Sequence, residues 1–267
     1  MPRVLAVANQ KGGVGKTTTA INLATALAIA EQRILVVDMD PQGNLTSGVG
    51  LKGQSTTAGT IYQALTSQDP IDDPADFILE TRVKNLWLIP ADRNLTGAEV
   101  ELVNLPNRER RLRLLMEPLR DRFDFILIDT PPSLGLLTLN ALVAADAVLI
   151  PLNCEYFALE GLADLVATLR RVRAALNPTL DIAGVLMTMY DERTNLGQQV
   201  AKDIREFFKD RVFDTVIPRN VRLGEAPSHG LPAILYDVKS RGSEAYLTLA
   251  RELLAREASA PAVGTEP

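Results

Sequence analysis

A glycine-rich stretch near the N-terminus, residues 9–18 with the sequence NQKGGVGKTT, constrains the fold of this chain more than any other feature. It follows a short apolar run at residues 4–8, typical of a buried strand, and precedes residues 19–28, which are rich in helix formers. Glycines let successive backbone N–H groups turn toward an anion, and a helix start supplies further unpaired donors. The stretch therefore predicts a phosphate-binding loop between a strand and a helix.

Two side chains of this loop have the positions that nucleotide chemistry requires. Lys16 would reach the β- and γ-phosphates, and Thr17 would place its hydroxyl on Mg²⁺. The match to G-x-x-x-x-G-K-[ST] is incomplete, because Gln10 stands where the first glycine is expected and a second lysine, Lys11, lies inside the loop. Glycines that only form a tight turn are the alternative. Spacing alone does not assign a role to Lys11, which could be a solvated charge.

Carboxylates follow two later apolar runs. The run at residues 33–38 ends in Asp38, with Asp40 two positions further on. The run at residues 123–129 ends in Asp129, and an apolar strand that ends in aspartate is the Walker B arrangement, in which the carboxylate orders Mg²⁺. In a parallel sheet, such strand ends lie at one edge, beside the phosphate loop. The alternative, that Asp38 and Asp40 only cap a turn, stays open at this point.

The rest of the chain alternates between short apolar runs and helical patterns. Further strands are predicted at residues 86–90, 147–152, 182–189 and 212–217, and helices at residues 61–65, 99–103, 107–120, 159–176, 198–209 and 243–256. There is no linker rich in proline, glycine or serine, and there is no internal repeat. We therefore predict one doubly wound α/β domain over residues 1–256, with a mostly parallel central sheet flanked by helices, and a disordered tail at residues 257–267.

Composition excludes several classes of protein. The single cysteine, Cys154, cannot form a disulfide within the chain or a cysteine metal cluster, and its apolar neighbours favour a buried, unreactive side chain. No signal peptide is evident, and no apolar run approaches the roughly 18 residues of a membrane span, so a soluble cytoplasmic protein is expected. The net charge of −5 argues against a wholly basic nucleic-acid binder but permits a local basic patch.

Five motifs in this order resemble the ParA/Soj chromosome- and plasmid-partitioning ATPases, which belong to the ParA/MinD class with a deviant Walker A loop. They are KGGVGKTT at 11–18, VDMDPQGN at 37–44, IDTPP at 128–132, MYDERTN at 189–195 and IPRNVR at 217–222. The resemblance covers residues 2–256. It implies a P-loop NTPase fold in the small form of the family, without an N-terminal helix-turn-helix and without operator binding.

The resemblance also implies roles that spacing could not assign. Lys11 matches the signature lysine that reaches across a nucleotide-sandwiched dimer to the other subunit's ATP, and Asp40 matches the switch I aspartate that positions the attacking water. With Lys16, these are the implied catalytic residues. Asp129 matches the Walker B carboxylate, and Asp38 is implied to support the metal. The implied ATP contacts are Lys11, Gly12, Gly13, Val14, Gly15, Lys16, Thr17, Thr18, Met187, Tyr190, Pro218, Arg219 and Asn220, and the implied Mg²⁺ ligands are Thr17, Asp38 and Asp129.

The expected activity is slow hydrolysis of ATP to ADP and phosphate with Mg²⁺, because phosphoryl transfer needs positioning and charge neutralisation more than covalent chemistry. The resemblance implies an ATP-dependent homodimer that binds double-stranded DNA of the nucleoid without sequence preference, through Arg193 and Arg222. Such binding rests on phosphate neutralisation and counterion release. A ParB-type centromere-binding protein is the implied partner that stimulates hydrolysis. Without the motifs, each arginine would be interpreted as a solvated surface charge.

The chain departs from the family at one position and leaves alternatives to weigh. Gly224 stands where relatives often carry serine, and the single histidine, His229, lies in a turn that favours a structural role. The main alternative is a MinD-like membrane-associated positioning ATPase, which would need a basic amphipathic C-terminal helix. The predicted last helix instead mixes both charges, in Arg251, Glu252, Arg256 and Glu257. A nitrogenase-reductase-like carrier would need two cysteines per subunit, and a purely DNA-bound scaffold would not need Asp40.

Overall fold

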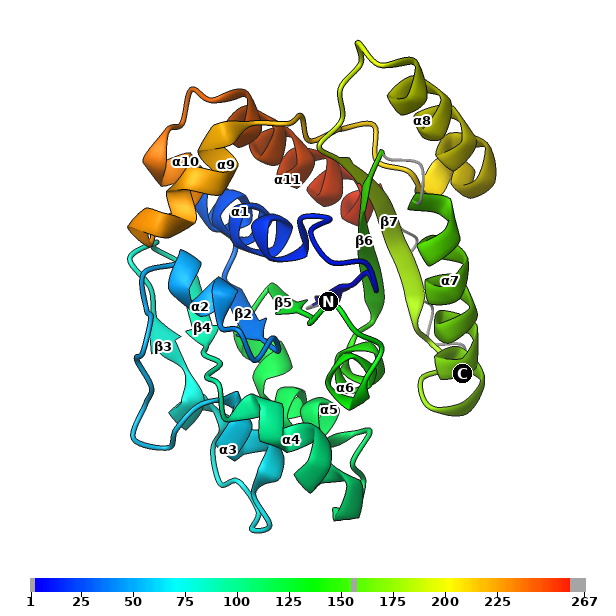
Figure 1. Ribbon diagram of the computed structural model, residues 1–267. Helices are drawn as coiled ribbons and strands as arrows, with labels where there is room; N and C mark the ends of the chain where they lie inside the picture. The colour runs from blue at the N-terminus through cyan, green and yellow to red at the C-terminus, as the bar shows by residue number, and fades with distance from the viewer. Residues whose placement is uncertain (1–2, 155–157, 260–267) are drawn as a thin grey trace.

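A seven-stranded sheet organises the computed structural model, which describes residues 3–154 and 158–259 (Figure 1). Its strands are β1 (Arg3–Val7), β2 (Ile34–Asp38), β3 (Leu79–Glu80), β4 (Leu86–Ile89), β5 (Phe125–Asp129), β6 (Ala147–Asn153) and β7 (Asp181–Thr188). They are ordered β3-β4-β2-β5-β1-β6-β7, and all pair in parallel except β3, which is antiparallel to β4. The predicted doubly wound α/β fold with a mostly parallel sheet is confirmed.

The register of the central strands brings their carboxyl ends into one row. Val7 of β1 and Asp38 of β2 both pair with Asp129 of β5. Strands β2, β5 and β6 are buried along their whole length, because parallel strands covered on both faces can be almost wholly apolar. The polar exceptions at the strand ends therefore gather at one edge of the sheet.

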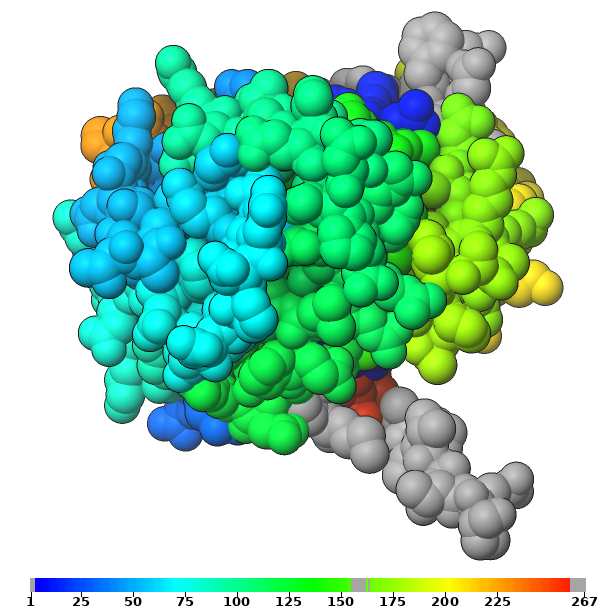
Figure 2. All heavy atoms as spheres, turned by 90° about the horizontal axis from the view of Figure 1, so that it is seen from below, coloured from blue at the N-terminus to red at the C-terminus, as the bar shows by residue number. Residues whose placement is uncertain are grey.

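Helices of very different length connect the strands. They are α1 (Lys16–Ile29), α2 (Asn44–Gly48), α3 (Ile61–Thr66), α4 (Leu95–Glu101), α5 (Arg111–Met116), α6 (Leu136–Ala144), α7 (Ala158–Ala175), α8 (Asn195–Phe208), α9 (Val221–Glu225), α10 (Ala233–Tyr236) and α11 (Arg241–Ser259). In one hydrophobic core, helices α1, α10 and α11 pack on one face of the sheet. In the other core, the six helices from α3 through α8 pack on the opposite face. Figure 2 shows the molecule from the side that α3, α4 and α5 cover.

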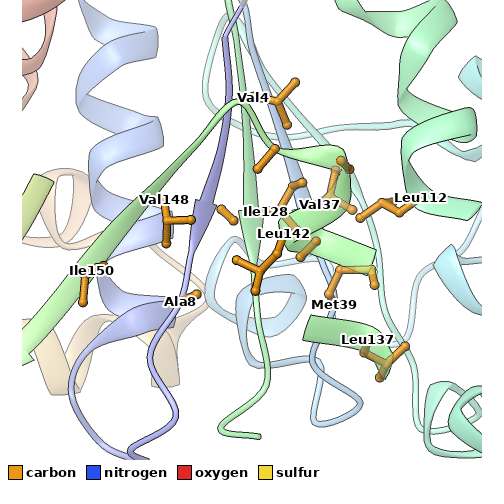
Figure 3. Packing of buried hydrophobic residues seen from close by; sticks show 14 of the residues in the cluster. Val4, Ala8, Val37, Met39, Leu112, Ile128, Leu137, Leu142, Val148 and Ile150 are labelled. Carbon is orange, nitrogen blue, oxygen red and sulfur yellow. The ribbon is translucent and has the colours of Figure 1, made fainter. Parts of the chain in front are cut away.

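The second core shows how the helices fix the sheet. Strand residues such as Val37, Ile128 and Val148 lie beside Leu112 of α5 and Leu142 of α6 (Figure 3). All five side chains are at most 1% exposed. Complete burial of such side chains contributes roughly 1.5–3 kcal/mol each to folding.

The strand predicted at residues 212–217 is wrong. Val212 forms only an isolated bridge to Val185, so β7 is the edge of the sheet. The backbone N–H groups of Asp214 and Thr215 donate to the Glu252 carboxylate of α11, at 2.8 and 2.9 Å, instead of to a strand. The N–H groups of Phe213 and Ile217 still donate to Val185 and Met187 of β7, at 3.0 and 2.9 Å, but the diverted Thr215 N–H between them interrupts the ladder.

Two helix predictions also need correction. The helix predicted at residues 107–120 is much shorter, because α5 ends at Met116 and a 3-10 helix, Glu117–Arg122, follows with Pro118 near its start. Proline has no N–H for an α-helical hydrogen bond and disfavours the α-conformation in the residue before it. Helix α6 was not predicted at all. It is apolar on nearly all sides and buried, so its sequence lacks the alternating face that marks a surface helix.

The last helix packs on the body of the protein, as its mixed charges predicted. Tyr246, Leu249 and Leu253 are buried against the core that contains α1, and Arg256 donates to Glu252 and lies over the Phe213 ring. Helix α11 continues past the expected end at Arg256 to Ser259, and residues 260–267 of the predicted tail lie outside the described residues. Within the described part of the chain, no helix has the length and apolar character needed to cross a bilayer.

Cys154 directly follows β6 and is 9% exposed, which confirms the prediction of a buried side chain. Burial raises the pKa of its thiol to about 11, although Arg205 partly opposes this rise. Because the thiolate is the nucleophile, the native protein should react with iodoacetamide at pH 8 about a hundredfold more slowly than a free thiol. Mass spectrometry of samples labelled in buffer and in urea measures this. Equal labelling rates in both would contradict the assignment of Cys154 as an inert buried group.

Candidate active site

The loop between β1 and α1 has the backbone conformation of an anion-binding turn. Gly13 and Gly15 have φ values of 71° and 87°, in the left-handed region that favours glycine. Thr188 at the end of β7 donates its hydroxyl to the Val14 carbonyl oxygen at 2.8 Å, which ties the loop to the sheet. Helix α1 begins at Lys16, so the first unpaired N–H groups of the helix lie next to the loop.

The side chain of Lys16 is directed into this site. It is 6% exposed, and its ammonium group donates to the Lys11 carbonyl oxygen at 3.1 Å. Burial lowers the pKa of Lys16, while the carboxylates of Asp129 and Asp40 oppose this effect. The loop and the carboxylates predicted on separate strand ends are therefore brought together in the fold.

Asp38 is fully buried and holds a turn. Its carboxylate accepts hydrogen bonds from the Asp40 N–H at 3.1 Å and from the N–H and hydroxyl of Thr46 at 2.9 and 2.7 Å. Burial raises the pKa of Asp38 to about 6, and these hydrogen bonds limit the rise. These hydrogen bonds agree with the alternative interpretation of Asp38 as a residue that caps a turn. Asp40 is 7% exposed and accepts a hydrogen bond from the Gln42 N–H at 2.9 Å.

Asp129 is buried without a hydrogen-bond partner for either carboxylate oxygen among the residues that the structure describes. Burial and the neighbouring Asp38 raise the pKa of Asp129 well above its usual value, and the Thr17 hydroxyl and Lys16 offset this only in part. Such a carboxylate is costly unless a cation binds it. Mg²⁺ fits here, because it takes few protein oxygens and completes its shell with phosphate oxygens and water. Of the three predicted ligands, Thr17 and Asp129 would hold the ion, whereas Asp38 already accepts three hydrogen bonds.

A cavity of about 240 Å³ lies beside the loop. Of the predicted ATP contacts, it contains Gly15, Thr18, Pro218, Arg219 and Asn220; the other lining residues are Thr188, Met189, Ile217, Leu223, Gly224 and Tyr246. An added Cβ at Gly224 would meet no atom within 4 Å, so the serine that relatives often carry would be accommodated.

Of the five ATP contacts predicted outside the glycine loop, Met187 and Tyr190 do not line this cavity. Met187 is fully buried in the core of the sheet. Tyr190 lines a separate, more polar cavity of about 520 Å³ together with Arg193 and Arg219. The end of β7 reaches the first cavity through Thr188 and Met189 instead. Met189 has a φ of 49°, which is unusual for a residue with a side chain and turns the chain at this point.

Several residues of the site carried no sequence signal. Tyr246 of α11 lines the cavity, and its hydroxyl lies 3.1 Å from the Thr19 hydroxyl of α1. Asn9 and Asn153 contact Lys11 from the loop and from the end of β6. The contacts of Tyr246 with Thr19 and of Asn153 with Lys11 join segments far apart in the chain, so neither periodicity nor motif spacing could identify them.

The two predicted DNA-binding arginines lie on separate elements. Arg193, in the loop before α8, has a side chain that is 85% exposed and bonds both oxygens of Asp191 at 2.8 and 2.7 Å. Arg222 is half-exposed on α9 and lies 2.7 Å from Glu225 and 3.4 Å from Asp237. In Figure 1, α8 and α9 lie on either side of α11. Each arginine therefore has acidic neighbours in the monomer.

Comparisons with known proteins agree with this geometry. The model of the AAA domain family matches residues 2–182. The chromosome partitioning protein ParA of Myxococcus xanthus is 57% identical over 255 residues, which are 96% of this chain and 89% of that protein. The sporulation initiation inhibitor protein Soj of Bacillus subtilis is 53% identical over 255 residues, 96% of this chain and 99% of the relative.

Among solved structures, cobyrinic acid a,c-diamide synthase from Mycobacterium smegmatis with bound ADP and magnesium has a TM-score of 0.83 and 37% identity. The match covers 97% of this chain and 96% of that chain. Another structure of that protein holds an ATP analogue and magnesium, with a TM-score of 0.83 and 36% identity.

The unpaired Asp129 carboxylate generates a prediction about stability. The pKa of Asp129 is higher in the folded than in the unfolded chain, so ionisation of this carboxyl group favours the unfolded chain. The folded protein should therefore lose stability through Asp129 as the pH rises above about 4. Asp129→Asn should therefore stabilise the magnesium-free protein at pH 7 by roughly 1–3 kcal/mol, and the gain over the unsubstituted protein should shrink toward pH 4. The same substitution should reduce the extra stability that ATP with Mg²⁺ confers.

Urea unfolding with and without ATP and Mg²⁺ measures both effects. Asp124→Asn is the control. Asp124 pairs with Arg33 at the amino ends of β5 and β2, far from the carboxyl ends that form the site, so this substitution should not alter the response to Mg²⁺. A loss of stability in the magnesium-free Asp129→Asn protein would show that the carboxylate has favourable partners of its own.

Proposed function

The chain belongs to the ParA/Soj family of chromosome-partitioning P-loop ATPases, and from this premise we propose how it acts in segregation. ATP binding drives formation of a sandwich dimer, and the dimer binds nucleoid DNA without sequence preference. Slow hydrolysis, stimulated by a ParB-type centromere-binding protein, releases it from the DNA. The observation that carries the proposal is the meeting of Lys11, Lys16 and the unpaired Asp129 at one glycine loop.

The nucleotide lies with its phosphates at the loop and its base in the adjacent cavity. Lys16 and the N–H groups of residues 12–18 bind the phosphates, because a loop with left-handed glycines turns these donors toward an anion. Thr17 and Asp129 would hold Mg²⁺, which would neutralise charge on the phosphates. The base packs between the end of β7 and Pro218–Asn220, whose side chains line the same cavity.

Asp40 orients the water that attacks the terminal phosphate. Burial lowers the pKa of Lys16, and the Asp40 carboxylate, with Asp129, opposes this effect, so Asp40 lies near Lys16 at the phosphate end of the site. The Gln42 N–H holds one of its oxygens at 2.9 Å. A carboxylate in this position aligns water by accepting its hydrogen bond. A scaffold that only binds nucleotide would have no use for it.

Lys11 acts on the nucleotide of the partner subunit. It lies at the start of the loop, on the side of β6, and donates to Asn153 at 3.4 Å. A lysine supplied in trans couples dimerisation to the presence of ATP, in the way that an arginine finger couples activity to a partner. Hydrolysis then removes the charge that the lysine binds, and the dimer dissociates.

DNA binding follows from the dimer rather than from a strongly basic surface. Arg193 and Arg222 each have acidic neighbours in the monomer, so DNA phosphate must compete with Asp191, Glu225 and Asp237. Binding by a single subunit is therefore weak. A dimer doubles the number of phosphate contacts, and counterion release makes the affinity rise steeply with that number.

Asp40→Ala should leave ATP binding and dimerisation intact and lower kcat by about 10²-fold or more, because positioned proton-accepting groups contribute at least that much. Phosphate release under saturating ATP measures the rate, and light scattering measures the dimer. Asp121→Ala, at an exposed position of the 3-10 helix Glu117–Arg122, is the control and should keep full activity. Unchanged turnover in Asp40→Ala would remove Asp40 from the mechanism.

Arg193→Ala and Arg222→Ala should weaken binding of the ATP-bound dimer to DNA of any sequence. The slope of log affinity against log salt should fall by about 0.9 for each lost phosphate contact. Arg33→Ala is a matched control, because Arg33 also bonds both oxygens of an aspartate, Asp124, but near the opposite edge of the sheet. Equal losses in all three variants, or a footprint at one defined sequence, would contradict this DNA-binding surface.

A further inference from the structure

The side chain of Asn9 occupies the point where the chain leaves the sheet and enters the glycine loop. The last backbone hydrogen bond from this segment to β6 runs from the Ala8 N–H to the Leu149 carbonyl oxygen at 3.1 Å. Asn9 follows and is only 3% exposed. Its Nδ2 donates to the Pro151 carbonyl oxygen at 2.8 Å, and its Oδ1 accepts from the Lys11 N–H at 3.0 Å. Both ends of the carboxamide are therefore engaged.

These two hydrogen bonds do different things. The bond to Pro151 replaces the next backbone contact between the chain and β6, so the main chain turns away while the attachment to the strand continues. The bond to the Lys11 N–H, two residues on, is an Asx-turn, which bends the chain in the way that a backbone turn does. One side chain thus ends the sheet pairing and begins the loop.

The consequence concerns Lys11 more than the rest of the loop. Its N–H is held by Asn9, and its carbonyl oxygen accepts from Lys16 at 3.1 Å. Its ammonium group lies 3.4 Å from Oδ1 of Asn153, two residues beyond Pro151 on the same strand. Asn9 therefore connects the backbone of Lys11 to β6. The side chain of Lys11 contacts the end of the same strand, at Asn153.

We propose that Asn9 is a positioning residue for Lys11 and presets this lysine for the partner's phosphates. The inference rests on the proposed action of Lys11 in trans. A flexible loop would lose conformational freedom when the dimer forms, and fixing its start in advance reduces that loss. Lys16 and Thr17 lie on α1, so binding of ATP within one subunit does not depend on Asn9 in the same way.

Asn9→Ala removes both hydrogen bonds. We expect the affinity of the monomer for ATP to change by less than about threefold, whereas dimerisation at saturating ATP weakens by about tenfold or more, as the loss of buried hydrogen bonds predicts. The kcat measured at a fixed protein concentration should fall while KM for ATP stays nearly constant. Asn9→Ser keeps an acceptor for the Lys11 N–H but cannot reach Pro151. Its dimerisation at saturating ATP should be weaker than that of the unsubstituted protein and stronger than that of Asn9→Ala.

Asn22 provides a matched control for the loss of a buried carboxamide. It is also 3% exposed, and it makes an equivalent pair of hydrogen bonds, from Nδ2 to the Thr18 carbonyl oxygen and from the Ala233 N–H to Oδ1, both at 2.8 Å. These bonds lie within α1 and between α1 and α10 and do not contact Lys11. Asn22→Ala should lower thermal stability by an amount similar to Asn9→Ala without weakening the dimer at saturating ATP.

A double-mutant cycle with Lys11→Ala separates positioning from general destabilisation. If Asn9 acts through Lys11, Asn9→Ala should have no further effect on dimerisation in the Lys11→Ala background. Additive effects, or a dimer unaffected by Asn9→Ala at saturating ATP, would overturn the role of Asn9 and leave the proposed function standing. If the unsubstituted protein fails to dimerise with ATP, or Lys11→Ala dimerises normally, the proposed function fails as well.

Discussion

The parallel register of the central strands is the constraint on which the site depends. Val7 and Asp38 both pair with Asp129, so the ends of β1, β2 and β5 form one row. The glycine loop continues from the end of β1, and the carboxylates lie on the two strands beside it. A slip of one residue in any of these pairings would turn the aspartates to the other face of the sheet. The apolar cores on both faces prevent such a slip, because almost every strand side chain is buried.

The same arrangement places two buried carboxylates, Asp38 and Asp129, side by side, and they differ in the hydrogen bonds that they accept. Asp38 receives three hydrogen bonds, two of them from Thr46, and thereby holds the chain that leads to α2. Asp129 receives none within the described residues. An unpaired buried carboxylate opposes folding, and natural sequences keep such a group where a ligand compensates for it. The carboxylate of Asp38 therefore supports the local structure, whereas the carboxylate of Asp129 is suited to bind a cation.

Long-range contacts complete the site around this row. Thr188 at the end of β7 bonds the Val14 carbonyl, and Tyr246 of α11 reaches Thr19 of α1. Glu252, also on α11, takes the N–H groups of Asp214 and Thr215, so residues 212–217 bond β7 only through Phe213 and Ile217, form no continuous strand, and lead to Pro218 at the cavity. The C-terminal helix therefore shapes the base-side cavity as well as the core.

The sequence by itself determined the α/β class, the strand–loop–helix unit around Lys16, and the aspartates at the strand ends, because each depends on neighbouring residues and on periodicity. Local patterns did not determine the length of α5, the existence of α6 or the path of residues 212–217, because these depend on Pro118, on burial and on Glu252. Only the tertiary structure decided which side chains meet. Asn9 and Pro151 are 142 residues apart and Thr188 and Val14 are 174 apart, and hydrogen bonds over such separations follow from sheet order, which no local pattern encodes.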